Sequence, residues 1–384
     1  MRTSAAIQMQ DLAIELFRQG HEPIVITPSN EINAEWEAGF MDGIQVLRLA
    51  VGRTHKTGSY FLRTLSEFLL PFLMIYKLRK SPFNDLQWKL IIWYSPSIFF
   101  GPLIWKMKRS AGCKTYLILR DIFPEWALDL GLIRKGVTYA FFKLIANFQY
   151  STADTIGVQT KSNLTYLTDW ANRPHRNLQV LQNWQTPRKN IGSSINVTNT
   201  SLAGRKIFAY IGNMGIAQGM DIFIDLAENL NNNKDLGFLF VGRGSEVPRL
   251  KARIKELSLS NILFFDEVDP QEMPGLLEQC HIGLLALDPR HTTHNIPGKF
   301  LTYLLASLPI LARVNSGTDL AHLIEEEGLG KVYVGDSVVE LRALAEEIIY
   351  NQKSYENMAS RGQKLAKQMF SSKTAVQQII NAIK

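Results

Sequence analysis

Short apolar runs alternate with longer segments of helical periodicity along nearly the whole chain. Each apolar run is interpreted as a short buried strand. Strands that alternate with helices are typical of parallel sheets joined by crossover helices. The pattern therefore predicts an α/β fold with two Rossmann-like domains and a ligand cleft between the carboxyl edges of their sheets.

The predicted strands fall into two groups. The first group is HEPIVIT (21–27), IQVLRLAV (44–51), KLIIWYS (89–95), KTYLILRD (114–121), TIGVQT (155–160) and LQVLQNW (178–184). The second group is KIFAYIGN (206–213), GFLFVGRG (237–244), NILFFDE (261–267), IGLLAL (282–287), LPILARV (308–314) and GKVYVG (330–335).

A polar stretch without apolar periodicity separates the two groups. Residues 189–204 within it are interpreted as an interdomain linker. A chain of 384 residues suits two domains, because single domains usually hold about 100–200 residues. The predicted domains are residues 1–188 and residues 205–367, and the remaining tail is helical.

The beginning of the chain departs from the Rossmann pattern, which normally opens with a strand and a loop. Residues 4–19 have the pattern of a helix that ends at Gly20, before the first predicted strand. Either the first strand of the domain is missing or the sheet begins differently, and we favour a missing strand.

Positive charge is concentrated in the first half of the chain. The net charge is +7, and residues 1–189 hold 23 Lys and Arg against 14 Asp and Glu. A basic half can bind nucleic acid or an anionic membrane surface. No motif of a nucleic-acid-binding module is found, so no nucleic-acid partner is predicted.

An amphipathic segment in the basic half favours the membrane. Residues 60–80 place apolar side chains on one helical face and Arg63, Lys77, Arg79 and Lys80 beside it, as in helices that lie in a membrane interface. The alternative, a crossover helix that packs on the core, suits this segment alone at least as well. Membrane contact is favoured by a wider basic cluster in the same domain, which consists of Lys106, Lys108, Arg109, Arg134, Lys135 and Lys143. No stretch is long and apolar enough for a transmembrane helix, and no signal peptide is found.

The two cysteines predict no special chemistry. Cys113 and Cys280 lie far apart in apolar segments and are interpreted as buried thiols of a chain in a reducing, cytoplasmic compartment. His291 and His294 are three residues apart but lack a further ligand at metal-binding spacing, so no metal site is predicted.

Two glycine-rich turns follow neighbouring predicted strands of the second group. Gly212 and Gly215 lie between a strand and a helix that begins at about Met220, and Gly242 follows the next strand. Glycine lets the backbone approach a ligand, and free N–H groups at a helix start can bind a diphosphate. The alternative is a pair of tight turns without a ligand, but two such turns on one sheet edge favour a nucleotide site.

Two further residues are candidates for chemistry. Lys299 stands in the first turn of a predicted helix, where the helix dipole disfavours a cation, and a bound phosphate would explain its place. Asp121 follows the strand that ends at Leu119 and is the best-placed carboxylate to accept a proton or orient a hydroxyl group. Its alternative role is to cap the helix that follows.

The chain resembles the retaining glycosyltransferases of family 4, which have the GT-B fold. The resemblance rests on LAIELFRQGHEPIVIT, on the block from SPSIFFGPL to RDIFPEWALDLG, on YIGNMGIAQGMD and FVGRG, and on NIPGKFLTYLLASLPILA with its P-x-K-x-x-x-Y-x-x-x-x-x-P pattern. It covers nearly the whole chain. The most similar branch builds bacterial O-antigen repeats and includes N-acetyl-L-fucosamine transferases.

This resemblance implies transfer of an amino sugar from a UDP-sugar to a lipid-linked acceptor in lipopolysaccharide synthesis. The acceptor would be an undecaprenyl-diphosphate-linked saccharide at the inner face of the cytoplasmic membrane, where the enzyme would be peripheral. The UDP-sugar is a substrate, so no cofactor is implied, and cationic side chains would replace a metal. The last helix, about 368–384, would pack back on the first domain.

The resemblance also implies which residues act. Asp121, Arg120 and Lys299 would be catalytic, and the basic residues of 60–80 would meet the membrane and the acceptor. The donor-binding residues would be Gly212, Asn213, Gly215, Gln218, Gly242, Arg243, His294, Pro297, Lys299 and Thr302.

Several positions differ from the family pattern. His294 and Thr302 stand where the family often has two glutamates, and Arg120 stands where it has a histidine. Met214 and Gln218 lie where the phosphate loop usually carries Arg and Lys. Two other functions therefore stay open: a nucleotide-sugar-binding protein without turnover, and a sugar-nucleotide epimerase of the same fold.

Overall fold

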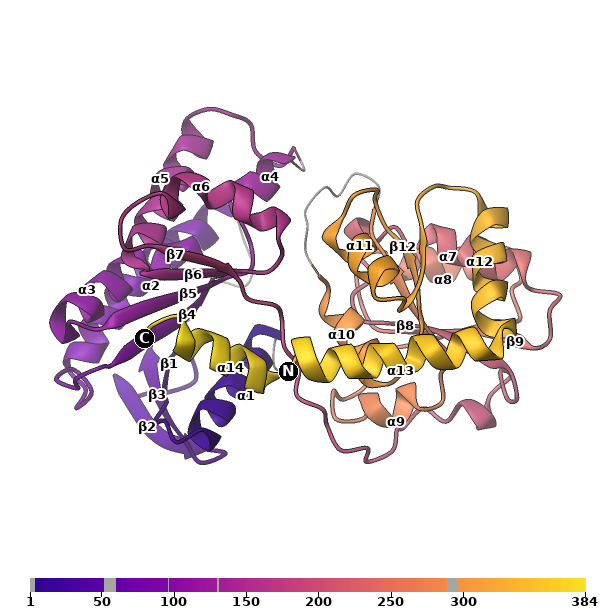
Figure 1. Cartoon of the computed structure of the whole chain (residues 1–384), viewed down its shortest axis with the longest axis horizontal. Coiled ribbons are helices and arrows are strands. Elements are labelled where there is room, and N and C mark those ends of the chain that lie inside the picture. Colours follow the sequence, from indigo (N-terminus) through magenta and orange to yellow (C-terminus); the bar gives the residue numbers. More distant parts are fainter. Residues whose placement is uncertain (1–3, 52–59, 96, 130, 289–295) are drawn as a thin grey trace. The chain divides into compact units, whose positions relative to one another are not determined.

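The computed structural model describes residues 4–51, 60–95, 97–129, 131–288 and 296–384. The chain forms two compact units (Figure 1). Unit 1 combines Met1–Asn183 with Ser372–Lys384, and unit 2 is Trp184–Ser371.

Unit 1 contains two sheets that share one apolar core. The first sheet has the strand order β1-β3-β2, and the second is parallel with the order β4-β5-β6-β7. Buried Leu47, Trp93 and Leu117, from β3, β4 and β5, belong to the same core. The strands are β1 (Ile24–Ser29), β2 (Trp36–Met41), β3 (Ile44–Ala50), β4 (Leu90–Ser95), β5 (Lys114–Leu119), β6 (Thr155–Val158) and β7 (Asn177–Val180).

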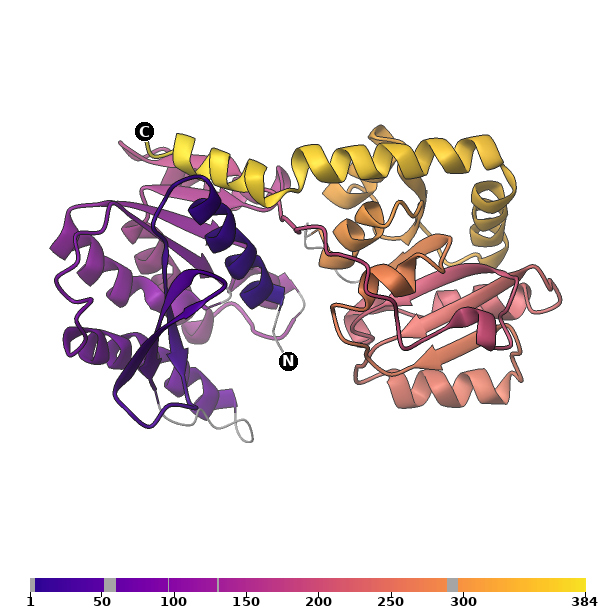
Figure 2. The same cartoon turned by 90° about the horizontal axis from the view of Figure 1, so that it is seen from below.

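The helices of unit 1 cover these sheets. They are α1 (Ser4–Arg18), α2 (Tyr60–Arg79), η1 (Ile98–Phe100), α3 (Gly101–Ala111), α4 (Glu125–Asp129), α5 (Val137–Thr152), η2 (Ser162–Leu167), α6 (Thr168–Ala171) and α14 (Ser372–Asn381). The C-terminal helix α14 lies beside α1 in both views (Figures 1 and 2). Its Gln378 donates a hydrogen bond to the carbonyl oxygen of Val180 at 2.6 Å.

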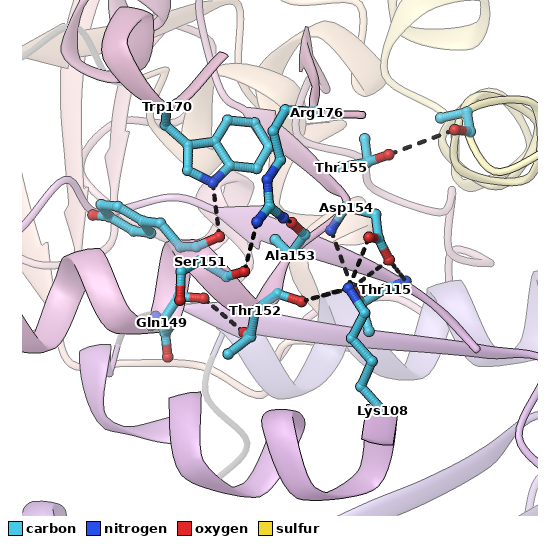
Figure 3. Close-up of polar contacts among 12 residues, drawn as sticks. Lys108, Thr115, Gln149, Ser151, Thr152, Ala153, Asp154, Thr155, Trp170 and Arg176 are labelled. Carbon is cyan, nitrogen blue, oxygen red and sulfur yellow. Dashed lines mark hydrogen bonds and ion pairs between the residues drawn. The ribbon is translucent and has the colours of Figure 1, made fainter. Parts of the chain in front are cut away.

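A polar network fixes the end of α5 to the parallel sheet (Figure 3). The ammonium group of Lys108 lies 2.7 Å from the carboxylate of Asp154, which also accepts the backbone N–H of Thr115 at 2.9 Å. Arg176 donates a hydrogen bond to the carbonyl oxygen of Ser151 at 2.9 Å. These bonds join α3, α5, β5 and the start of β6.

Unit 2 is built on a six-stranded parallel sheet of order β10-β9-β8-β11-β12-β13. The strands are β8 (Lys206–Ile211), β9 (Leu236–Val241), β10 (Ile262–Phe265), β11 (Ile282–Ala286), β12 (Ile310–Arg313) and β13 (Gly330–Tyr333). The helices are η3 (Val197–Asn199), η4 (Ile216–Gln218), α7 (Asp221–Asn229), α8 (Val247–Glu256), α9 (Met273–Leu277), α10 (Gly298–Leu305), α11 (Asp319–Glu326), α12 (Val338–Tyr350) and α13 (Gln352–Met369).

The α/β class with two Rossmann-like domains is confirmed, and every predicted strand is present. β2 is an addition to the predicted set. It forms an antiparallel hairpin with β3 through Asp42 and Gly43, which have φ of 54° and 79°. An Asp-Gly pair between apolar runs is a strong hairpin signal, because both residues tolerate positive φ. The additional strand expected before the first helix stays a prediction.

The stretch predicted as a free linker, residues 189–204, packs on unit 2. Ile195, Val197 and Leu202 are buried in its core. The backbone N–H of Val197 donates to the side-chain oxygen of Gln279 at 2.8 Å, and the amide nitrogen of Gln279 donates back to Ile195 at 3.0 Å. Three apolar side chains in a polar sequence are enough to hold the segment on the domain.

Candidate functional site

The loops after β8 and β9 lie backbone against backbone at the carboxyl edge of the unit 2 sheet. The N–H of Met214 donates to the carbonyl oxygen of Arg243 at 2.7 Å. A Cβ atom at Gly242 would lie 2.0 Å from the carbonyl oxygen of Gly212, and one at Gly244 would lie 2.1 Å from that of Met214. Gly242 and Gly244 also have φ of 151° and 153°, which favours glycine. Glycine is therefore required at both positions of the second loop.

Donor groups of the first loop converge on a single oxygen atom. The side-chain oxygen of Gln218 accepts the N–H of Gly215 at 2.8 Å and the side-chain amide of Asn213 at 3.0 Å. Helix α7 begins directly after this loop, at Asp221, close to the predicted position. The loop thus places N–H donors in front of a helix, an arrangement suited to an anionic oxygen.

Lys299 lies beside this loop in the first turn of α10. Its ammonium nitrogen contacts the hydroxyl group of Tyr210 and lies 3.8 Å from the centroid of the Tyr210 ring. A Cβ atom at Gly212 would be 4.0 Å from the same nitrogen. Burial lowers the pKa of Lys299 from 10.5 to about 7. Among the described residues no carboxylate forms an ion pair with this ammonium group, so an anion that entered beside Gly212 would gain a charged partner.

Tyr303 holds α10 in place against the sheet. Its hydroxyl oxygen accepts the backbone N–H of Ile211, the last residue of β8, at 3.0 Å. A Cβ atom at Gly283 would lie 2.4 Å from the Tyr303 ring, so the glycine makes room for the tyrosine. Tyr210 and Tyr303 are not among the predicted site residues, although Tyr303 is part of the P-x-K-x-x-x-Y pattern and Tyr210 is the last residue but one of β8, before a glycine turn.

Two other predicted donor residues have side-chain partners within unit 2. Arg243 forms an ion pair with Glu267 at 3.0 Å, and the hydroxyl group of Thr302 donates to the side-chain oxygen of Gln185 at 3.0 Å. Pro297 precedes α10 in an extended conformation. His294 lies outside the described residues.

In unit 1, Arg120 and Asp121 follow β5 at its carboxyl end. The buried guanidinium group of Arg120 donates to the carbonyl oxygens of Leu181 and Gln182, which follow β7. Burial lowers the pKa of Arg120 to about 10. Arg120 therefore joins two strand ends, and its catalytic role stays a prediction. Burial also raises the pKa of Asp121, against the opposing effect of Arg120, and α4 begins only at Glu125.

The cations predicted to meet the membrane differ in their pairing. Arg63 forms an ion pair with Glu67, one turn along α2, at 3.3 Å. Lys77 and Lys80 both lie near the carboxylate of Glu35, at 3.4 Å and 2.7 Å. Their positive charge is thus partly neutralised, and Arg79 ends the helix.

Two absences concern the described residues alone. In that part of the chain, no helix is both long and apolar enough to cross a bilayer. Nor does it contain a group of three or more His, Cys, Asp or Glu side chains placed to hold a metal ion.

Comparison with known proteins supports a glycosyltransferase. Residues 196–365 match the family model "Glycosyl transferases group 1", and they make up most of unit 2. The probable glycosyltransferase WbjE of Pseudomonas aeruginosa is 26% identical over 63% of this chain and 61% of its own length. The putative colanic acid biosynthesis glycosyl transferase WcaI of Escherichia coli is 24% identical over 62% of this chain and 61% of its own length. The chain thus aligns with less than two thirds of each relative.

Solved structures of similar fold cover the whole chain. Sucrose-phosphate synthase from Thermosynechococcus elongatus has a TM-score of 0.72 at 12% identity, over 99% of this chain and 92% of its own. HepE of Anabaena, solved with UDP and glucose, has a TM-score of 0.67 at 16% identity, over 99% and 95%. The lipopolysaccharide glycosyltransferase WaaG has a TM-score of 0.62 at 14% identity, over 100% and 97%. These likenesses show the GT-B fold, and the family match covers 170 of the 384 residues of the chain.

The close approach of the two loops predicts a sharp contrast between two glycines. Gly242→Ala would force a Cβ atom against the carbonyl oxygen of Gly212 and should lower the free energy of unfolding by about 2–4 kcal/mol. Gly298 is the first residue of α10 and has open space around it. Gly298→Ala should therefore change the free energy of unfolding by less than about 1 kcal/mol. Urea unfolding measures both, and equal effects would contradict the packing described for the loops.

Proposed function

We propose that this protein is a glycosyltransferase that moves a sugar from a UDP-sugar to a polyprenyl-diphosphate-linked saccharide during bacterial surface polysaccharide synthesis. The observation that carries the proposal is the buried ammonium group of Lys299 beside the glycine loop that follows β8. A donor diphosphate would supply the negative charge that this ammonium group lacks among the described residues. The solved complex of HepE with UDP and glucose supports the choice of a UDP-sugar.

The donor diphosphate would lie over Gly212, Asn213 and Gly215. The N–H of Gly215 and the amide of Asn213 already point to one oxygen, that of Gln218, and a phosphate oxygen could take its place. Gly212 has no side chain to block approach from the side of Lys299. The roles of Gly242, Arg243, Pro297 and Thr302 would be to shape the walls of this site.

The reaction would proceed by displacement of UDP from the sugar. Negative charge develops on the leaving diphosphate as the bond to the sugar breaks, and charged Lys299 together with the loop N–H groups would stabilise it. The acceptor hydroxyl group would attack from the same face as UDP departs, since no nucleophilic side chain is found at the loop. Asp121, whose pKa is raised by burial, would orient that hydroxyl group or take its proton. No step in this scheme requires a metal ion.

The sugar and the place of action are proposed from likeness to relatives. An N-acetyl-L-fucosamine or related amino-sugar donor is proposed on the resemblance to O-antigen transferases. The similarity to WbjE and to WcaI of colanic acid synthesis supports a role in a bacterial surface polysaccharide such as O-antigen. With a polyprenyl-linked acceptor, the enzyme would act in the cytoplasm, peripheral at the inner membrane face.

Lys299→Ala should weaken UDP binding at least tenfold at pH 7, because a charge-assisted contact to the diphosphate is lost. Lys251→Ala is the matched control, since Lys251 is a half-exposed lysine on α8 that pairs with Asp266 at 3.5 Å. Isothermal titration calorimetry with UDP measures both affinities. Unchanged binding by Lys299→Ala would remove Lys299 from the diphosphate site.

Donor affinity should also depend on pH. With a pKa of about 7, Lys299 in the free protein loses its charge as the pH rises above neutrality, whereas a bound diphosphate favours the charged form. Binding above pH 7 must therefore take up a proton, and the dissociation constant of a UDP-sugar should rise by up to about tenfold per pH unit. Titrations of wild type and of Lys299→Met with a UDP-sugar, between pH 6.5 and about 8.5, test this dependence. If the dissociation constant of wild type were as independent of pH as that of the variant, Lys299 would not be the titrating group.

Asp121→Asn should separate turnover from donor binding. Loss of a group that accepts a proton should lower kcat by roughly 100-fold or more, while UDP affinity stays within about twofold. Steady-state kinetics and calorimetry measure the two quantities. Normal turnover in the variant would reduce Asp121 to a structural residue after β5.

A further inference from the structure

Helix α2 presents a second apolar face in addition to the one that packs on the core. Met74 and Leu78 are buried in the core of unit 1, which accounts for the inward face. The outward face carries large apolar side chains that are between 37% and 51% exposed. They are Leu62, Leu65, Phe68, Leu69, Phe72, Leu73 and Tyr76.

Helix α5 continues this exposed apolar surface. Val137, Phe141, Leu144 and Phe148 follow a spacing of four, three and four residues, so they form one stripe along the helix. Val137 is 88% exposed and Leu144 is 69% exposed. Gln149 of α5 points inward: it is buried and donates to the hydroxyl group of Ser95 at 3.2 Å, which ties the helix to β4. The stripe is thus held outward by a fixed helix.

A groove joins the two helices. It holds about 340 Å³ and is lined by apolar residues alone. Its lining comes from α2, from η1 and the start of α3, and from α5: Phe68, Phe72, Phe99, Pro102, Leu144, Ile145 and Phe148. The rings of Phe68 and Phe99 are 6.0 Å apart and close one side. α3 contacts both α2 and α5 and adds the half-exposed Trp105.

Positive charge borders this surface. Residues 51–150 hold 15 Lys and Arg against 5 Asp and Glu. Arg79 and Lys80 come one turn after Tyr76, at the end of the exposed face of α2. Arg134 and Lys135 are exposed directly before α5. On α3, the guanidinium group of Arg109 lies 5.4 Å from the centroid of the Trp105 ring.

We propose that α2, α3 and α5 form one surface, the α2–α5 surface, that inserts into the headgroup region of an anionic lipid bilayer. Apolar and aromatic side chains ringed by cations are what such an interface binds. A second copy of the chain fits less well, because two copies of this surface would bring like charges together. The proposal extends the peripheral membrane location in the proposed function from the cations of α2 to a three-helix surface with an apolar groove.

The test is co-sedimentation of the full chain with vesicles of phosphatidylcholine alone and of phosphatidylcholine mixed with phosphatidylglycerol. Wild type should bind the mixed vesicles and bind the neutral ones much more weakly. Leu144→Asp should reduce binding at least tenfold, because an inserted side chain would carry a charge. The matched control is Val339→Asp on α12 of unit 2, where Val339 is 67% exposed, and it should bind like wild type.

A second test removes positive charge from the border of the α2–α5 surface. Arg134→Gln combined with Lys135→Gln should reduce binding to the mixed vesicles by about fivefold for each charge at low salt. Circular dichroism melting checks that each variant is folded, which the exposure of the changed side chains favours. Equal binding by wild type and Leu144→Asp, or no binding by wild type, would overturn the proposal. The proposal would also be overturned if wild type bound no vesicles but formed a dimer, and if Leu144→Asp dissociated that dimer.

These results are separate from those for the proposed function. UDP binding is measured without vesicles, and vesicle binding is measured without a donor. UDP binding without vesicle binding would refute the membrane role of the α2–α5 surface and leave the proposed transferase function unaffected. Vesicle binding without UDP binding would support the membrane role of the α2–α5 surface and contradict the proposed transferase function.

Discussion

The burial of the Lys299 ammonium group is the constraint on which the account of the active site depends. Burial lowers the pKa of Lys299 from 10.5 to about 7, so the surroundings disfavour the charged form of this group. The fold tolerates this cost because Tyr303 fixes α10 to the end of β8 and the Tyr210 ring faces the ammonium group. An anion bound beside Lys299 would favour its charged form, and in the proposed function the diphosphate of the donor is that anion.

The two units have different features that bear on the proposed function. In unit 2, the largely buried strands β8 and β9 end in two glycine loops at one edge of the sheet, and backbone groups would form most of the proposed anion site. In unit 1, the ends of β5 and β7 are tied together by Arg120, and the helices α2, α3 and α5 keep large apolar side chains exposed. Under the proposed function, the first unit would bind the lipid-linked acceptor and the second would bind the nucleotide donor.

Much of this fold could be predicted from the sequence, because parallel strands buried on both faces appear as unbroken apolar runs. The hairpin strand β2 was not predicted, since its residues are mixed in polarity and only Asp42 and Gly43 signal the turn. The glycine loops and Lys299 were found from their positions. Their partners Tyr210 and Tyr303 were not, because a contact between β8 and α10 joins residues far apart in the chain. The stripe on α5 was missed because it is apparent only once the helix is known to be uncovered.

The most direct test of the central claim is the mass of the product formed from a set of UDP-sugars and an undecaprenyl-diphosphate-linked N-acetylglucosamine analogue, with and without EDTA. We expect one UDP-sugar to yield a lipid longer by one sugar residue, with release of UDP and with the same yield in EDTA. A folded protein that binds UDP but forms no product from any donor would contradict it, and would indicate a nucleotide-sugar-binding protein without transfer.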